Sequence, residues 1–333
     1  MPESRFNLAA RPSMTLVLAA AAAAALVACG GDGEPEPTGA EPVAAPEASE
    51  FPQPTGTIEN LLAEVGTTNE VGATPASGTF TPGDERFSFA LLTVAGAQIL
   101  DANVAVYASR GISGKALGPF PARLEDLSTL PLFVADTTTP DDAKGVYVSE
   151  VPFNRAGEWR IAVVIDQGDG FVATPLTTSV FVSENQDIPE VGDTAPVTRT
   201  PTLQDVDGDA AEIDTRIPPS SMHEDDFAEV VGKEPVVLLF ATPALCQSRV
   251  CGPVVDIAEQ VKSVYDDDAA FIHMEIFEDN VYDPDRLRSQ PTDYGLQSEP
   301  WLFVIDASGK ITMRIEGAFS ANELEEALEP LIN

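Results

Sequence analysis

Residues 57–187 contain short runs of alternating or apolar residues, separated by glycine, proline and aspartate. Such runs are typical of β-strands, because successive side chains of a strand point to opposite faces of a sheet. The sequence DQGDG at residues 166–170 predicts the turn of a hairpin. Strands are expected over residues 86–92, 104–107, 145–148, 159–165 and 179–182. We therefore predict an all-β structure for this part of the chain.

The pattern changes after the polar, turn-rich segment 185–196. A continuous apolar run over residues 235–241 predicts a buried strand, and apolar residues at helical spacing then predict a helix. The expected elements after that strand are a helix over 253–264, strands over 269–277, 301–306 and 311–316, and a last amphipathic helix over 322–331. Alternating strands and helices indicate an α/β fold for residues 188–333.

The short strands and regular turns of residues 57–187 suggest an immunoglobulin-like β-sandwich. This part has no histidine, no cysteine and no cluster of catalytic residues. Trp159 is interpreted as a core residue. We therefore expect the sandwich to be an interaction or spacer module that precedes the α/β domain.

The first 28 residues have the features of an export signal. Arg5 and Arg11 give a positive start, and an alanine-rich stretch over residues 14–27 is too short for a comfortable transmembrane helix. The stretch ends in LVACG at residues 26–30, which resembles a bacterial lipobox. The resemblance implies cleavage before Cys29 and a lipid on its sulfur. The protein would then be extracytoplasmic and anchored to the cell membrane as a lipoprotein.

Residues 29–56 are expected to be a tether between that anchor and the folded domains. Residues 30–56 include six acidic residues, six prolines and no Lys or Arg, and they show no hydrophobic period. A segment of this composition is predicted to be extended and solvated.

The charge of the chain excludes one class of partner. The chain has 18 Lys and Arg against 54 Asp and Glu, a formal net charge of −36. Because nucleic-acid phosphates are bound by clustered Lys and Arg, we expect no nucleic-acid partner. The charge names no other partner, and the sequence indicates no oligomeric state.

The order of motifs in residues 190–333 resembles a thioredoxin-like domain. A buried strand leads into a loop with Cys246, and Pro253 stands early in the next helix, as in thioredoxins. The sequence YGLQSEPWLF at residues 294–303 resembles the family segment in which Tyr-Gly precedes a cis-proline, here Pro300, and a strand. The opening VGDTAP at residues 191–196 resembles that of extracytoplasmic redoxins, and Gly317 follows the last strand as in the family.

This resemblance implies a thioredoxin-like fold and thiol–disulfide exchange. The substrates would be thiols and disulfides of exported proteins, and Pro300 would shape the groove that receives them. We expect no cofactor and no metal. With Cys29 assigned to the lipid, the chemistry is left to Cys246 and Cys251.

Cys246 and Cys251 are separated by four residues, whereas the usual family motif has two. Five helical steps set side chains about 140° apart around the axis and about 7.5 Å along it, while a disulfide needs Cα atoms about 4.4–6.8 Å apart. We therefore expect Cys246 in the loop, a helix that starts near Ser248 as N-cap, and Cys251 in its first turn. Cys246 is then the exposed nucleophile and Cys251 the resolving thiol. The reverse assignment stays open, because Cys251 is closer to the helix dipole.

The sequence departs from the family pattern around this pair. Thioredoxins carry a buried acid and a tryptophan beside the phenylalanine of the first strand, where this chain has Leu239 and Ala241 around Phe240. Glu299 stands before Pro300, where the family usually has an apolar residue or threonine. A carboxylate there would raise the pKa of the attacking thiol, or would replace the missing proton acceptor. The plainer interpretation of Glu299 is a solvated surface glutamate.

Two other functions remain as alternatives. In the first, the cysteines form a structural disulfide in a non-catalytic binding scaffold. In the second, the fold handles copper, as extracytoplasmic copper chaperones do with two cysteines and a histidine. His273 and Met274 are the candidate ligands for copper. A hydrogen-bonded strand residue is nevertheless the favoured interpretation of His273, and His223 is expected in a loop.

Overall fold

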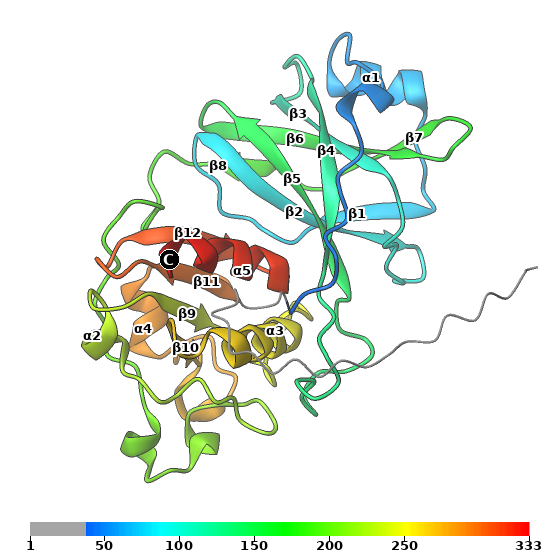
Figure 1. Ribbon diagram of the computed structural model, residues 1–333. Coiled ribbons are helices and arrows are strands. Elements are labelled where there is room, and N and C mark those ends of the chain that lie inside the picture. Colours follow the sequence, from blue (N-terminus) through cyan, green and yellow to red (C-terminus); the bar gives the residue numbers. More distant parts are fainter. Residues whose placement is uncertain (1–37, 333) are drawn as a thin grey trace, which may run out of the picture. The chain divides into compact units, whose positions relative to one another are not determined.

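The structure is a computed structural model, and it describes residues 38–332 (Figure 1). The predicted signal peptide over residues 1–28, the predicted lipidation site Cys29 and the first residues of the expected tether lie outside the described residues. Within the described part, the strands form an eight-stranded sheet followed along the chain by a four-stranded sheet. None of the helices in residues 38–332 has the length and apolar character needed to cross a bilayer.

The first sheet is antiparallel, in the order β1-β2-β5-β4-β3-β6-β7 with β8 beside β6. Five of its strands contain or overlap the five expected segments, and the expected hairpin turn joins β6 to β7. The strands are β1 (Val71–Pro75), β2 (Gly83–Thr93), β3 (Val104–Arg110), β4 (Leu117–Asp126), β5 (Gly145–Phe153), β6 (Gly157–Asp166), β7 (Phe171–Pro175) and β8 (Val180–Val182).

Strand β4 joins the two halves of this sheet. It pairs with β3 as far as Ala122 and with β5 from Arg123 onward. The inward side chains of both halves, such as Phe89 of β2 and Val163 of β6, meet in one apolar core. Trp159 is buried in this core, as expected. The two halves face each other across this core, as the sheets of a sandwich do. They are nevertheless connected into one sheet, because β4 has ten residues and pairs with a different neighbour at each end.

The outer face of β3 and β6 is covered by helix α1 (Ile58–Val65). The helix begins with a capping box, in which Thr57 Oγ1 accepts from Asn60 N–H and Asn60 Oδ1 accepts from Thr57 N–H. Ile58 and Leu61 are buried against the sheet. Burial of this one apolar face stabilises a helix that is too short to persist alone.

Most of residues 38–56 are exposed, but both ends of this segment contact the folded part of the chain. Phe51 is buried in the same cluster as α1, and Tyr107 Oη donates to Pro52 O at 2.6 Å. Thr38 N–H and Oγ1 both donate to Glu325 at 2.8 and 2.7 Å. These contacts join distant parts of the chain, so a local composition rule does not detect them.

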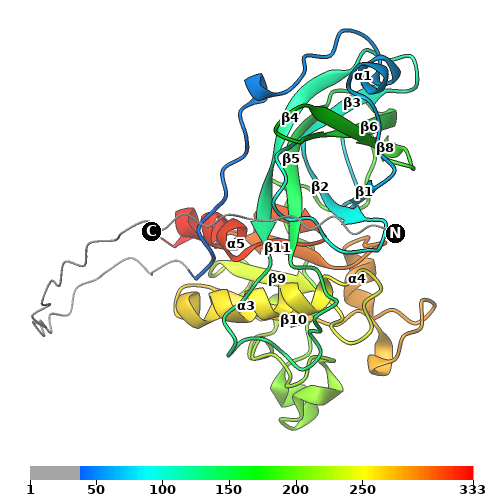
Figure 2. The same cartoon turned by 90° about the vertical axis from the view of Figure 1, so that its right-hand side faces the viewer.

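The second sheet has the order β10-β9-β11-β12. Strands β9 and β10 are parallel, and β11 is antiparallel to both β9 and β12. Helix α3 connects β9 to β10 and packs with α5 on one face of the sheet, whereas α2 and the end of α4 pack on the other (Figures 1 and 2). The elements are α2 (Phe227–Val230), β9 (Val236–Phe240), α3 (Cys251–Tyr265), β10 (Ala270–Met274), α4 (Ser289–Asp293), β11 (Trp301–Ile305), β12 (Ile311–Glu316) and α5 (Ala321–Leu328).

All five residues of β9 are buried, because both faces of this central strand are covered. Val237 and Leu239 face α3 and α5, and Val236, Leu238 and Phe240 face the other side. The α/β pattern expected for this part of the chain is thus observed. Short 3-10 turns complete the described structure at Ala48–Glu50, Leu203–Val206, Ala210–Glu212, Glu278–Asn280 and Glu329–Leu331.

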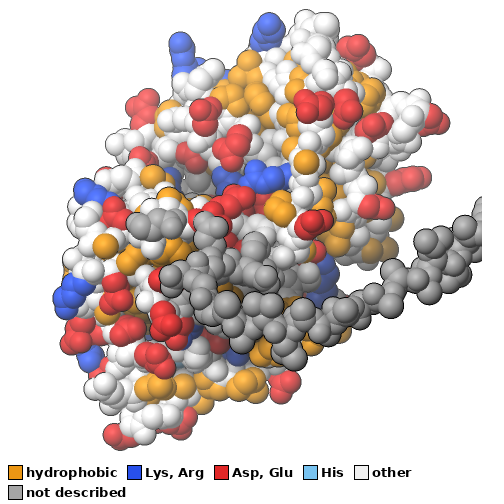
Figure 3. Space-filling view, viewed as in Figure 1, with side chains coloured by type: hydrophobic (Ala, Val, Ile, Leu, Met, Phe, Trp, Pro, Cys, Tyr) orange, Lys and Arg blue, Asp and Glu red, His pale blue; other side chains and the backbone are white. Residues whose placement is uncertain are grey.

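The two sheets share an apolar cluster and a set of ion pairs. Val146 and Val148 of β5 pack in the same cluster as α3 and α5. Arg86 of β2 makes two parallel bonds to Glu323 of α5, at 2.7 and 2.8 Å. The two parallel hydrogen bonds satisfy the charged groups of both Arg86 and Glu323 at a largely buried position. On the face of the molecule drawn in Figure 3, the Asp and Glu side chains are scattered and form no single patch.

We expect Arg86→Met to lower the free energy of unfolding by about 2 kcal/mol, because Glu323 loses its bidentate partner while nearly buried. The control is Arg160→Met, which removes a more exposed pair with Glu59 at 3.2 Å and should cost less than about 1 kcal/mol. Urea unfolding of both variants measures the difference. Equal losses would contradict a special role for the Arg86–Glu323 pair.

Candidate functional site

Cys246 and Cys251 are joined by a disulfide, with Cα atoms 6.0 Å apart. Cys246 lies in the loop after β9 and is half-buried, and Cys251 is the first residue of α3 and fully buried. The structure thus places one cysteine in the loop and the other in the first helical turn, as the spacing requires. An approaching molecule meets the Cys246 sulfur, not that of Cys251.

The start of the helix differs from the prediction. Ser248 is not the N-cap; α3 begins at Cys251, and Val250 precedes it without a side-chain cap. Arg249 has a φ of 64°, a left-handed conformation that interrupts the helix before it can reach back to Ser248. Ser248 Oγ instead lies 3.2 Å from the Cys246 sulfur. Because α3 begins at Cys251, the positive end of the helix dipole favours negative charge on a sulfur there.

Hydrogen bonds connect the loop that carries Cys246 to a buried glutamate, Glu275. Ala244 N–H donates to Thr215 Oγ1 at 3.1 Å, and Thr215 donates through both N–H and Oγ1 to Glu275 Oε1 at 2.8 and 2.5 Å. Glu275 is almost fully buried next to the end of β10. This chain of bonds fixes the loop relative to the sheet.

Pro300 and Glu299 lie at the start of β11. Their peptide bond is cis, as the family segment predicts, and Pro300 is buried. Glu299 is half-buried, and burial raises the pKa of its carboxyl group. Pro300 O accepts from Gly317 N–H at 2.8 Å, which joins two of the expected motifs.

A cavity of about 1010 Å³ opens beside these residues. Residues 247–250, which lie between the two cysteines, form part of its wall together with Ser298 and Glu299. The rest of its lining comes from the end of β12 and from the first sheet, over residues 74–78, 96–98 and 140–144 with Ala90, Leu92, Leu100 and Val146. The cavity therefore lies between the cysteine loop and Glu299, although Cys246, Cys251 and Pro300 themselves do not line it.

The segment between β4 and β5, residues 127–144, covers the start of α3. Ala143 N–H donates to Arg249 O at 3.0 Å, and Leu130 N–H donates to Gln260 Oε1 at 2.6 Å. Thr138 lies so close to the helix that a Cβ at Gly252 would be 2.8 Å from its Oγ1. This cover accounts for the burial of Cys251, and the irregular sequence of the segment gave no signal of it.

Asp256 of α3 anchors the same cover. Its Oδ2 accepts from Thr138 Oγ1 at 2.7 Å and from Ala135 N–H at 3.2 Å, and its Oδ1 accepts from Arg216 Nε at 3.0 Å. Burial raises the pKa of Asp256, while these donors and the charge of Arg216 oppose the rise. We expect the carboxylate to stay charged at neutral pH, because Arg216 is buried against it.

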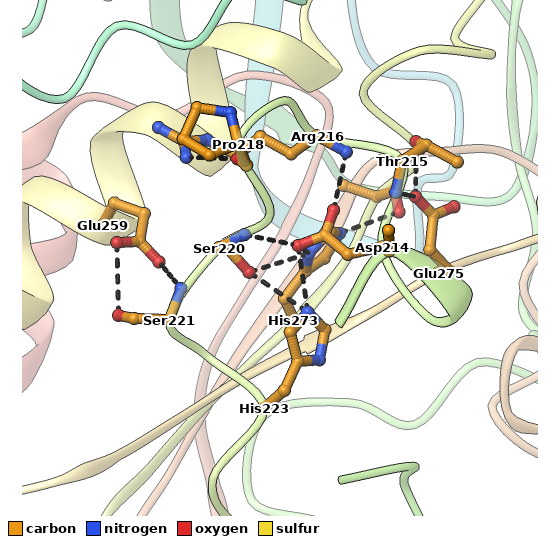
Figure 4. A network of polar contacts seen from close by, with 12 residues as sticks. Asp214, Thr215, Arg216, Pro218, Ser220, Ser221, His223, Glu259, His273 and Glu275 are labelled. Atoms are coloured by element: carbon orange, nitrogen blue, oxygen red, sulfur yellow. Dashed lines mark hydrogen bonds and ion pairs between the residues drawn. The ribbon is translucent and has the colours of Figure 1, made fainter. Parts of the chain in front are cut away.

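A second polar cluster lies beneath the loop and contains both histidines of the chain (Figure 4). Asp214 Oδ2 lies 3.0 Å from His223 Nε2 and 3.3 Å from His273 Nδ1. Burial alone would raise the pKa of Asp214, but the two histidines hold it well below its usual range. Burial lowers the pKa of His273, but Asp214 outweighs this and raises it to about 9.

These histidines only partly follow the expectations. His273 is a hydrogen-bonded residue of β10, as expected, with Nε2 donating to Ala241 O at 3.1 Å. His223 lies in a loop, as expected, but its side chain is buried in the same cluster with Asp214, and the ligand atoms of the three residues all lie within 4.8 Å of one another. These three residues can hold a metal ion. Their separation in sequence hid this, and the only signal was that the chain has just two histidines.

Comparisons with known proteins give little guidance. No protein-family model and no curated protein matches the chain. Among solved structures, it is similar to a thiol:disulfide interchange protein of the thioredoxin family from Chlorobium tepidum TLS, at 17% identity over 44% of this chain and 99% of that one, with a TM-score of 0.29. It is also similar to the Lin-41 filamin domain, at 12% identity over 34% and 93%, with a TM-score of 0.21. At these TM-scores neither similarity bears on function.

We expect Gly252→Ala to lower the free energy of unfolding by about 1–3 kcal/mol, because the new methyl group meets Thr138 Oγ1. Thr138→Ala removes that atom, so the double variant should lose less than the two single variants added together. Gly170→Ala is the control, since a Cβ there meets nothing within 4 Å. Denaturant unfolding of the four variants measures the coupling, and strict additivity would show that Thr138 does not press on α3.

Proposed function

We propose that this chain is a membrane-anchored, extracytoplasmic thiol–disulfide oxidoreductase that acts on exported proteins. The observation that carries the proposal is the asymmetric cysteine pair at the start of α3. One sulfur is accessible and the other is buried, and the loop between them lines the cavity beside Pro300. The LVACG sequence around Cys29 supports the membrane anchor.

The order of the second sheet supports a thioredoxin-like fold for residues 188–333. A helix follows the central strand β9, a parallel strand β10 lies on one side, and the antiparallel strands β11 and β12 lie on the other. In that fold the reactive cysteines precede this helix and a cis-proline precedes β11, which matches Cys251 and Pro300. The first sheet would then be an immunoglobulin-like module that contributes a wall of the substrate cavity.

The exchange proceeds in two balanced steps. The thiolate of Cys246 attacks one sulfur of a substrate disulfide, a bond forms between them, and the other substrate sulfur leaves as a thiolate. The thiolate of Cys251 then attacks Cys246, restores the Cys246–Cys251 disulfide, and releases the second substrate thiol. The substrate gains two electrons and the cysteine pair loses them; the reverse sequence oxidises a dithiol.

The difference in burial between the two cysteines supports Cys246 as the nucleophile and Cys251 as the resolving thiol. Cys251 is fully buried beneath the β4–β5 segment, so a sulfur of a folded or extended polypeptide cannot reach it first. Cys246 is half-buried in the loop and is the sulfur that can form the mixed disulfide. Once that bond has formed, Cys251 is already at bonding distance for the second step.

The alternatives use the same pair differently. A copper site built from the cysteines and His273 is disfavoured, because Nδ1 of His273 faces Asp214 and not the cysteines, Nε2 donates to Ala241 O, and Met274 packs in the apolar core. A structural disulfide in a binding scaffold would need neither an accessible sulfur nor a nearby cavity. The following experiment separates it from the enzyme.

We expect Cys246→Ser to abolish exchange, and Cys251→Ser to accumulate a mixed disulfide at Cys246, because the second step is blocked. Insulin reduction and mass spectrometry of trapped species measure the two outcomes. Ala244→Ser, at an exposed position of the same loop that does not line the cavity, is the control and should keep its activity. A binding scaffold is indicated if Cys246→Ser behaves like the wild type and Cys251→Ser traps nothing.

Glu299→Gln should accelerate alkylation of the reduced Cys246 thiol by about threefold to tenfold at neutral pH, because a carboxylate near the thiol opposes its ionisation. Burial raises the pKa of Glu299, so the carboxyl is neutral in acid and the two proteins should react alike there. The difference should grow as pH rises through that raised pKa. A pH–rate profile with iodoacetamide measures it, with Glu229→Gln, exposed on α2, as control. Parallel profiles would exclude an effect of Glu299.

A further inference from the structure

The buried polar cluster beneath the cysteine loop has four ligand-type atoms directed at one point (Figure 4). Ser220 Oγ lies 3.2 Å from His223 Nε2 and 3.3 Å from His273 Nδ1. Asp214 Oδ2 lies 3.0 and 3.3 Å from the same two nitrogens. All four residues are 5% exposed or less, so the cluster is closed to solvent.

We propose that Asp214, His223 and His273, with Ser220 as a weaker fourth ligand, bind one Zn²⁺ ion. Zinc bonds to nitrogen and oxygen ligands are about 2.0–2.2 Å long, so ligand atoms of a tetrahedral site lie about 3.3 Å from one another. Four of the six distances between these atoms, at 3.0–3.3 Å, agree with that spacing, and the ligand atoms of Asp214, His223 and His273 all lie within 4.8 Å of one another. Two imidazoles and a carboxylate are a ligand set suited to zinc, whereas Cu(I) prefers sulfur.

The surroundings orient these ligands as the outer shell of a metal site does. His273 Nε2–H donates to Ala241 O, so Nδ1 faces the cluster, and zinc binding there would displace its proton. Asp214 accepts Arg216 N–H at Oδ1 and Ser220 N–H at Oδ2, at 2.7 and 2.6 Å. Each ligand side chain is therefore held before any ion arrives.

The backbone fixes the two histidines relative to each other. His273 N–H donates to Met222 O at 2.9 Å, so the residue before His223 pairs with the edge strand β10. His223 O in turn accepts from Leu203 N–H at 2.9 Å. The end of the segment that carries His223 is thereby attached to β10 and to the turn that begins at Leu203.

A closed site with this ligand set is structural and not catalytic. The ion would join residues 214–223 to β10, and through Ala241 O to the start of the loop that carries Cys246. The inference is independent of the proposed redox function, because the cysteines are not ligands and remain bonded to each other.

The first test uses the wild-type protein with its disulfide oxidised, so that thiolates cannot bind metal. We expect one Zn²⁺ per chain by elemental analysis after zinc exposure and dialysis. X-ray absorption at the zinc edge should show nitrogen and oxygen ligands including imidazole, without sulfur. Absence of bound zinc, a shell that contains sulfur, or a shell without imidazole would overturn the proposal.

Variants identify the ligands. His223→Gln and Asp214→Asn should each weaken zinc binding by more than about 100-fold, since loss of even an outer-shell partner costs 10–100-fold. Asp267→Asn, in an exposed acidic loop, is the control and should bind as the wild type does. If His223→Gln binds zinc with unchanged affinity, the zinc is bound by surface carboxylates and the proposed site is wrong. The X-ray absorption spectrum is taken on the wild-type protein, so it can still refute the proposal if a variant fails to fold.

Discussion

The arrangement of the cysteine site depends on the buried ion pair between Arg216 and Asp256. Charges in the interior are tolerated only when each is paired and its remaining hydrogen-bonding groups are satisfied. Here the guanidinium donates to Asp256, Pro218 O and Phe133 O, and the carboxylate accepts from the β4–β5 segment. Three stretches of chain that are far apart in sequence must therefore meet at one place on α3. The cover of Cys251 follows from that meeting.

Features with a local physical signal could be predicted. The central strand β9 is apolar on both faces, so its continuous run of Val, Leu and Phe is recognisable without any partner. The spacing of Cys246 and Cys251 excludes one regular helix, and this alone placed one of them in the loop. The order of sequence motifs anticipated the cis bond before Pro300.

Features that depend on distant contacts could not be predicted. The helix start moved from Ser248 to Cys251 because Arg249 adopts a left-handed conformation, which is set by contacts such as that of its carbonyl with Ala143. Asp214 and His223 lie on an irregular loop, where no period indicates which way a side chain points. An acidic, proline-rich composition predicted solvation for residues 38–56, but a single buried Phe51 and two bonds from Thr38 are enough to attach them.

The origin of the cavity walls affects how the sequence of this protein can evolve. Its wall over residues 74–78 and 140–144 belongs to the first sheet and its loops, whereas the sulfurs and Pro300 belong to the second. Substitutions in that first wall alter the shape offered to an incoming molecule without touching the groups that set the reduction potential. Under the proposed function, selectivity and chemical reactivity would be encoded in separate stretches of one gene, and each could drift while the other is held constant.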